Sequence, residues 1–352
     1  MSETPASPVA SRFLLTTACL VIVIAGLREA ADALVVPFIL SVFLAMLGVP
    51  PLGWLRRRGL PAPIAILVVV LGIVAVIGGL GAIVGTSATA FSQAVPQYQI
   101  RLERLLESVD TQFAQWEIGV SVATLAEDLI NPGRAFQLAT RLLTSLAGFL
   151  SDFLVVFLTM IFILTEAAGF PAKARAAFGA ASGKLLKFGD VMTQVHHYLL
   201  IKSAISLGTG LALGIWVWIL GVDFPVLWGL LAFLLNYIPN IGSMMAAVPP
   251  LLVSLIQPEG GLTMVLMVAI GYMVVNILLG NFIEPGLMGQ QLGLSTLVVF
   301  VSLVFWGWVL GPVGMLLSVP LTMVAKILLE NSSELRWVAV LLDKSPSARA
   351  EI

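Results

Sequence analysis

The sequence predicts an all-α integral membrane protein, and two observations carry this prediction. Of its 352 residues, 59% are hydrophobic and only 11% are charged, whereas soluble domains usually carry about 25% charged residues. The apolar residues also form long stretches without a charge, which is typical of membrane-spanning helices rather than of buried strands. The net charge of −1 gives no reason to expect a nucleic-acid partner.

About eight hydrophobic segments can be delimited, and each is a candidate membrane helix. They comprise residues 13–27, 33–50, 62–86, 142–165, 198–220, 225–256, 262–283 and 294–329. These segments divide the chain into N-terminal membrane helices (1–86), an extramembrane region (87–141), a membrane helix with a basic loop (142–197), a core with two long segments (198–330) and a C-terminal tail (331–352).

Charged residues predict the orientation. Arg56, Arg57 and Arg58 follow the second segment without a nearby acid, and the loop 171–197 also has an excess of basic residues. Cytoplasmic loops carry such an excess. Region 87–141, which has more acids than bases, is then outside, and both termini are expected in the cytoplasm.

The extramembrane region begins with an amphipathic helix, VPQYQIRLERLLESVDTQFAQW. Its apolar residues recur at steps of three and four, which is the helical period. We expect this face to pack on the same chain or on a sister subunit rather than to form a ligand site. The residues are Tyr98, Leu102, Leu105, Val109, Phe113 and Trp116.

Segments 225–256 and 294–329 are too long for one crossing and too short for two, because one crossing takes about 20 residues. The first is interrupted from Asn236 to Gly242, and the second at Gly311, Pro312 and Gly314. Each reads as a re-entrant hairpin of two half-length helices. Each hairpin also follows one full span, so the sequence predicts an inverted repeat of span plus hairpin.

Broken helices at membrane depth indicate a site, because unpaired backbone is tolerated there only against protein or a water-filled cavity. Half-helix ends offer N–H and C=O groups and dipole charge to a solute or an ion. The alternative is that the asparagines only cap the broken helices. The candidate pathway residues are Asn236, Pro239, Asn240, Gly242, Asn276, Asn281, Glu284, Gly311 and Gly314.

The stretches FLLNYIPNIGSMMAAVPPLL (233–252) and NFIEPGLMGQQLGLSTLVVFVSLVFWGWVLGPVGMLLSVPLTMVAKIL (281–328) resemble the autoinducer-2 exporter family of bacterial membrane proteins. The resemblance covers most of the chain. It implies a transporter of the bacterial inner membrane with eight membrane segments, and a homo-oligomer for which a pentamer is the candidate. It also implies a small polar solute such as a quorum-sensing signal, or exchange of Na⁺ or Li⁺ for H⁺. Ser295 and Thr296 stand where family members carry a proline.

Three ionisable residues are candidates for coupling or relay roles, each with a structural alternative. Glu284 is either part of an ion pathway or an interfacial carboxylate. Lys202 either couples transport or extends to the inner interface. Asp152, inside an apolar segment, is either paired structurally or coupled to protons.

These patterns predict a secondary transporter whose partners are the lipid bilayer, a small solute and H⁺ or Na⁺. No nucleotide-binding motif occurs, so an ion gradient or the solute's own gradient would drive it. The alternatives are a channel-like pore and an envelope scaffold that uses helix 91–116. We expect no enzyme activity, no cofactor and no metal site, because His196 and His197 are the only histidines and no nucleophile or metal-ligand motif occurs.

Overall fold

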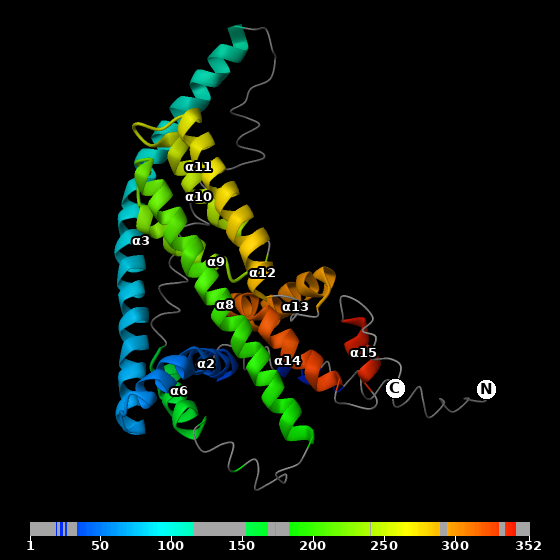
Figure 1. The fold of residues 1–352 in the computed structure, drawn as a ribbon. Coiled ribbons are helices and arrows are strands. Elements are labelled where there is room, and N and C mark those ends of the chain that lie inside the picture. The colour runs from blue at the N-terminus through cyan, green and yellow to red at the C-terminus, as the bar shows by residue number, and fades with distance from the viewer. Residues whose placement is uncertain are drawn as a thin grey trace, which may run out of the picture.

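The computed structural model describes residues 34–115, 153–167, 183–239, 241–288, 294–330 and 335–342, together with residues 19, 22, 23, 25, 26 and 173. Within these ranges the regular structure is helical and contains no strand. The helices are α2 (Val36–Arg57), α3 (Ala62–Gln115), α6 (Phe153–Ala167), α8 (Gly183–Ile219), α9 (Pro225–Leu235), α10 (Ile241–Ile256), α11 (Leu262–Val275), the π-helix η2 (Asn276–Ile283), α12 (Glu284–Met288), α13 (Thr296–Leu316), α14 (Ser318–Glu330) and α15 (Arg336–Leu341). Figure 1 shows α3 and α8 running through much of the length of the molecule.

Five helices in the described ranges are long and apolar enough to cross a membrane. The all-helical membrane fold is therefore confirmed in its coarse form, whereas eight separate segments are not. The five candidate spans are Val36–Arg57, Ala62–Arg104, Thr193–Ile219, Leu262–Met288 and Thr296–Leu316. Of segment 13–27, only residues 19, 22, 23, 25 and 26 are among the described residues.

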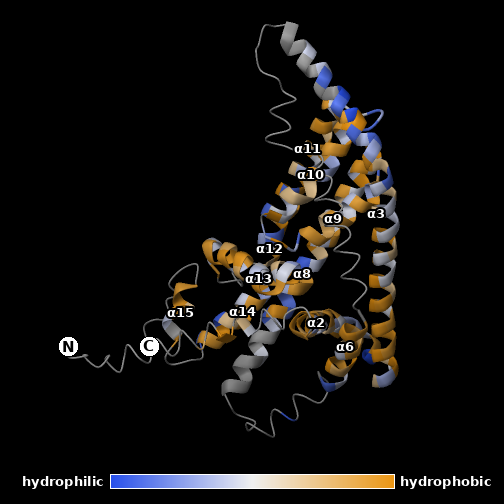
Figure 2. Ribbon diagram, turned by 180° about the vertical axis from the view of Figure 1, so that it is seen from behind, coloured by the Kyte–Doolittle hydropathy of each residue, from blue (hydrophilic) through white to orange (hydrophobic). Residues whose placement is uncertain are grey.

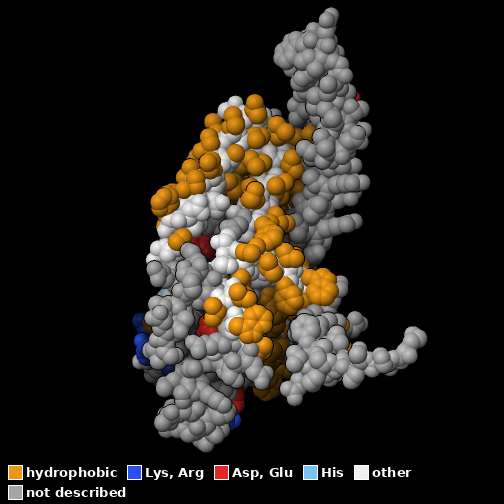
Figure 3. Space-filling view, turned by 90° about the vertical axis from the view of Figure 1, so that its right-hand side faces the viewer, with side chains coloured by type: hydrophobic (Ala, Val, Ile, Leu, Met, Phe, Trp, Pro, Cys, Tyr) orange, Lys and Arg blue, Asp and Glu red, His pale blue; other side chains and the backbone are white. Residues whose placement is uncertain are grey.

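Large apolar side chains are exposed along several of these spans, as expected for helices that contact lipid. Phe38, Leu67, Trp218 and Phe282 are each more than half exposed. Figure 2 shows apolar residues around most of α2 and α9, and Figure 3 shows them covering much of one face. Soluble monomers rarely expose contiguous apolar patches of more than a few hundred Å², so a surface with this many exposed large apolar side chains fits a bilayer.

Helix α3 differs from the expectation, because it runs from Ala62 to Gln115 without a break. The predicted boundary after residue 86 falls inside this helix. Its 54 residues extend about 80 Å at 1.5 Å per residue, and the hydrocarbon core is about 30 Å thick. Pro96 lies within the helix and does not end it.

The C-terminal half of α3 packs on the same chain through its apolar face. The Phe91 ring meets the rings of Phe224 and Trp228 edge to face, with centroids 5.8 and 5.5 Å apart. The Tyr98 hydroxyl donates a hydrogen bond to Asp223 Oδ2 (2.7 Å). Leu102 packs on the same core cluster, whereas the side chains of Leu105, Val109, Phe113 and Trp116 lie outside the described part of the chain.

The first long segment is broken where the sequence predicts it, between α9 and α10, and its two ends lie together. The Asp223 N–H donates to Gln257 Oε1 (3.0 Å), and Gln257 Nε2 donates to the Gly221 carbonyl (3.0 Å). At the turn, a Cβ at Gly242 would collide with the Leu235 carbonyl, so only glycine allows this close return. We call α9 and α10 with residues 236–240 hairpin 1.

The second long segment also reverses, at Gly311. This glycine has φ 62° and ψ −148°, which are not helical. The Ser302 hydroxyl reaches across to the Ser318 carbonyl (2.9 Å), and Trp306 Nε1 donates to Thr322 Oγ1 (2.9 Å). We call α13 and α14 hairpin 2; Gly314 lies within it, where a Cβ would collide with the Trp306 carbonyl.

Candidate functional site

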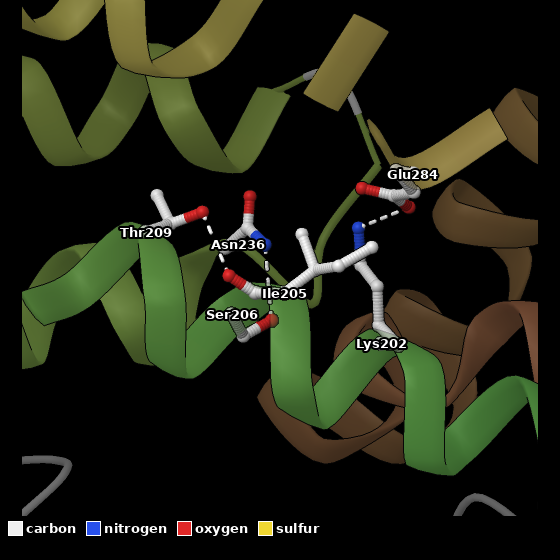
Figure 4. A network of polar contacts seen from close by, with 6 residues as sticks. All are labelled: Lys202, Ile205, Ser206, Thr209, Asn236 and Glu284. Atoms are coloured by element: carbon white, nitrogen blue, oxygen red, sulfur yellow. Dashed lines mark hydrogen bonds and ion pairs between the residues drawn. The ribbon is translucent and has the colours of Figure 1, made fainter. Parts of the chain in front are cut away.

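Helix α8 carries a polar stripe through an otherwise apolar span. Lys202, Ser206 and Thr209 are spaced four and three residues apart, so they lie on one helix face. All three are buried. Thr209 donates to the carbonyl of Ile205 in its own helix (2.9 Å), whereas Lys202 and Ser206 contact other elements (Figure 4).

The turn of hairpin 1 is fastened to this stripe by two hydrogen bonds. Asn236 Nδ2 donates to Ser206 Oγ (3.0 Å), and the Tyr237 hydroxyl donates to Ser203 Oγ (2.8 Å). Asn236 directly follows the last residue of α9 and is its C-terminal cap, so a helix C-terminus lies against α8. Asn236 therefore does more than cap α9, since its amide joins two elements that are far apart in sequence.

A buried ion pair lies on the same face of α8. Lys202 Nζ is 2.6 Å from Glu284 Oε1, and the side chains are only 6% and 18% exposed, respectively. The interpretation of Lys202 as an interfacial side chain is therefore wrong, because its ammonium points to Glu284 (Figure 4). A buried charge is costly unless it is paired, and each of these residues supplies the partner of the other.

Glu284 follows directly after a π-helix, which sequence reasoning did not predict. Residues Asn276–Ile283 form this wider helix, and Glu284 is its C-terminal cap. π-Helical turns are rare and are frequently found at functional sites. Asn276 is half-buried and Asn281 is exposed, and in the described part of the chain neither residue is hydrogen-bonded to the ion pair.

The two hairpins approach α8 at neighbouring positions. Hairpin 1 contacts Ser203 and Ser206. Val319 and Met323 of hairpin 2 share an apolar cluster with Tyr198 and Leu199, about one helical turn before Lys202. The ion pair thus lies on the part of α8 where contacts from both hairpins meet.

The remaining candidate residues fall in three places. Pro239 lies in the turn of hairpin 1, Gly242 in the first turn of α10, and Gly311 and Gly314 in hairpin 2; none of these four residues makes the side-chain hydrogen bonds to α8 described above. Asn240 and Asp152 are outside the described residues. Sequence reasoning missed Ser203, Ser206, Thr209 and Tyr237, although hydroxyl residues at helical spacing beside Lys202 were a usable signal.

These features define a class: a multi-pass α-helical membrane protein in which a broken helix and a buried ion pair meet on one long helix. Such a combination is typical of membrane transporters. The chain matches the AI-2E family transporter model over residues 13–334, and it belongs to that family.

Similar proteins bear this out. The chain is 41% identical over 323 residues to the AI-2 transport protein TqsA of Escherichia coli (strain K12), covering 92% of this chain and 93% of the relative. It is 36% identical to the putative transport protein YhhT of the same organism, over 94% of this chain and 93% of the relative. A putative transport protein of Haemophilus influenzae is 38% identical, over 94% and 96%. The family is one of transporters, not of enzymes.

Proposed function

We propose that the protein is a secondary transporter of the bacterial inner membrane that moves a small polar solute past the Lys202–Glu284 pair. The observation that carries the proposal is the meeting, on one face of α8, of the hairpin 1 turn with this buried pair. Intramembrane ionisable residues are rare and usually serve a pathway. Polar side chains held against a broken helix offer the hydrogen bonds that orient a solute.

Both hairpins are proposed to be re-entrant, each returning to the membrane face from which it starts. The meeting of Asp223 with Gln257 at the ends of hairpin 1 supports this. Together with the preceding spans, the hairpins would form an inverted repeat around the site. This topology places residues 257–261 outside and both termini in the cytoplasm. A single cysteine at Glu259, in a protein whose Cys19 is replaced, would react with an impermeant thiol reagent only in this topology.

The solute and the coupling ion also belong to the proposal. One relative is named as an AI-2 transport protein, so autoinducer-2 is the first solute to test, with Na⁺ and H⁺ gradients as driving forces. We also propose that the protein forms a homo-oligomer, with a pentamer as the first candidate. A channel would differ by carrying far more than about 1,000 molecules per second per protomer, because alternating access needs steps of μs to ms or longer.

The test is solute flux in proteoliposomes containing the wild-type protein or the variants Asn236→Ala and Ser206→Ala. Each variant leaves one partner of a buried hydrogen bond unsatisfied, which costs about 1–3 kcal/mol. We expect at least about fivefold lower flux at equal insertion, since about 1.4 kcal/mol is a factor of ten and the lower bound of about 1 kcal/mol is about a factor of five. The matched control is Thr89→Ala, whose exposed hydroxyl contacts only its own helix at the Gly85 carbonyl. Unchanged flux in both site variants would refute the proposed site.

A further inference from the structure

We propose that Lys202 is a tethered counter-cation, which occupies Glu284 until a mobile monovalent cation such as Na⁺ or Li⁺ takes its place. This inference rests on the proposed function, because it assigns a cation-binding role to the same site. It is carried by the geometry of the ion pair, in which one carboxylate holds one ammonium at 2.6 Å in a largely buried position.

The first step of the argument is charge balance. The pair is neutral as a unit, and its ammonium is almost completely removed from water. A second cation on Glu284 beside the bound Lys202 would place two positive charges on one carboxylate, where the dielectric is low and repulsion is strong. A cation can therefore bind only when the ammonium leaves. A monovalent cation then restores the same net charge, whereas a divalent cation would leave one positive charge in excess.

The second step concerns which member of the pair is open to a mobile ligand. The Glu284 side chain is three times as exposed as that of Lys202, 18% against 6%. A cation therefore reaches the carboxylate more readily than an anion reaches the ammonium. The pair is accordingly a site for cations, with the acid on its accessible side.

The third step concerns the surroundings of the pair. Helix α9 ends at Leu235, and the following residue, Asn236, is bonded to Ser206 one turn along α8 from Lys202. The carbonyl end of a helix carries partial negative charge. Half-helix C-termini and carbonyl oxygens coordinate Na⁺ in transporters with broken helices. Hairpin 1 thus adds a second feature that favours a cation.

The fourth step is that Lys202 can leave without moving α8. Its ammonium is carried on a flexible four-carbon stem, and Figure 4 shows that stem extending from α8 towards Glu284 on a separate helix. When the ammonium swings away, the carboxylate stays in place at the end of η2. The exchange needs only a change of side-chain rotamer, which is fast compared with helix movement.

The experiment measures cation binding by the purified full-length protein in detergent, separately from flux. Thermal stability is recorded against NaCl or LiCl, with N-methylglucamine chloride keeping the ionic strength constant. We expect Na⁺ to stabilise the wild-type protein and Glu284→Asp, and to have no effect on Glu284→Gln. Lys202→Met should bind Na⁺ with about tenfold higher apparent affinity, because removing a competitor that fills a site about 90% of the time raises the apparent affinity about tenfold.

The matched control is Lys173→Met. Lys173 pairs with Glu166 at the same 2.6 Å, but both side chains are mostly exposed, at 71% and 56%. Removing this lysine should leave the Na⁺ dependence unchanged. An apparent Na⁺ affinity of Lys202→Met that equals or falls below that of the wild type would overturn the proposal.

A second readout uses the wild-type protein, in case Lys202→Met does not fold. Labelling of Lys202 by an amine reagent, quantified by mass spectrometry, should rise at least about threefold in saturating Na⁺, because the displaced ammonium is no longer held by Glu284. Labelling of Lys173 is the internal reference. Unchanged labelling of Lys202 in saturating Na⁺ would overturn the proposal. So would a thermal stabilisation that N-methylglucamine chloride produces as strongly as NaCl. If Na⁺ displaces the Lys202 ammonium but the protein carries no solute, the proposed function is refuted and the cation exchange at Glu284 stands.

Discussion

The crossing of α8 and α9 gives a prediction whose size follows from the structure. Gly229 of α9 faces Gly210 and Gly214 of α8, and a Cβ added to Gly229 would lie 2.7 Å from the Gly210 carbonyl oxygen and 2.9 Å from Gly214 Cα. Both neighbours are backbone atoms, which cannot rotate away. In Gly229→Ala the two helices would therefore have to separate.

The expected magnitude combines two opposing terms. Carbon atoms pack best about 3.5–4.0 Å apart, so the helices must part by about 0.5–1 Å, which forfeits a quarter to a half of the dispersion energy at the contact. Overpacking of this kind costs about 1–3 kcal/mol. Alanine in place of glycine returns about 0.5–1 kcal/mol through helix propensity. The net loss for Gly229→Ala is therefore up to about 2.5 kcal/mol, with a central value of about 1 kcal/mol.

The assay is equilibrium unfolding in mixed micelles, followed by tryptophan fluorescence, since Trp228 is fully buried beside the substitution. The control is Gly78→Ala in α3, where a Cβ would meet nothing within 4 Å. That variant should be as stable as the wild type or slightly more stable. If Gly229→Ala matches Gly78→Ala, the close backbone contact between α8 and α9 does not exist as described, and the position of hairpin 1 on α8 must be revised.

Two further variants test the turn of hairpin 1 and its base. Gly242→Ala would force the Leu235 carbonyl out of its place in the turn. We expect the solute flux to fall at least about tenfold. The control in the same assay is Gly72→Ala, where the added Cβ would meet nothing within 4 Å. Tyr98→Phe removes the hydrogen bond to Asp223 and should lower the free energy of unfolding by about 1 kcal/mol. A thermal melt identical to that of the wild type would mean that this contact does not hold α3 to hairpin 1.

The sequence was sufficient to predict where the two long segments break. Proline and glycine interrupt otherwise apolar runs, and their effects on the backbone are local, so Asn236 to Gly242 and Gly311 could be identified without tertiary information. The membrane class followed from composition for a similar reason. The hydropathy of a segment indicates whether its helix is surrounded by lipid or by water, and it can be read without knowing which helices pack against it.

The pairing of Lys202 with Glu284 could not be predicted in the same way. The two residues are separated by 82 positions, and their contact depends on how α8 and the rod of α11, η2 and α12 cross. The π-helix adds to the difficulty, because it shifts the faces of the residues that follow it relative to α-helical spacing. The continuity of α3 could not be predicted either, since its sequence changes from apolar to amphipathic while the helix itself continues from Ala62 to Gln115.

One feature of the architecture has a mechanical consequence. Helix α3 is one helix of 54 residues, and Figure 1 shows that it bends in its C-terminal part. Pro96 lies inside the helix, and a proline in a helix interior kinks it. Tyr98, two residues after Pro96, joins the helix to the base of hairpin 1 at Asp223, so a change in the angle of this bend would move the point at which hairpin 1 is held.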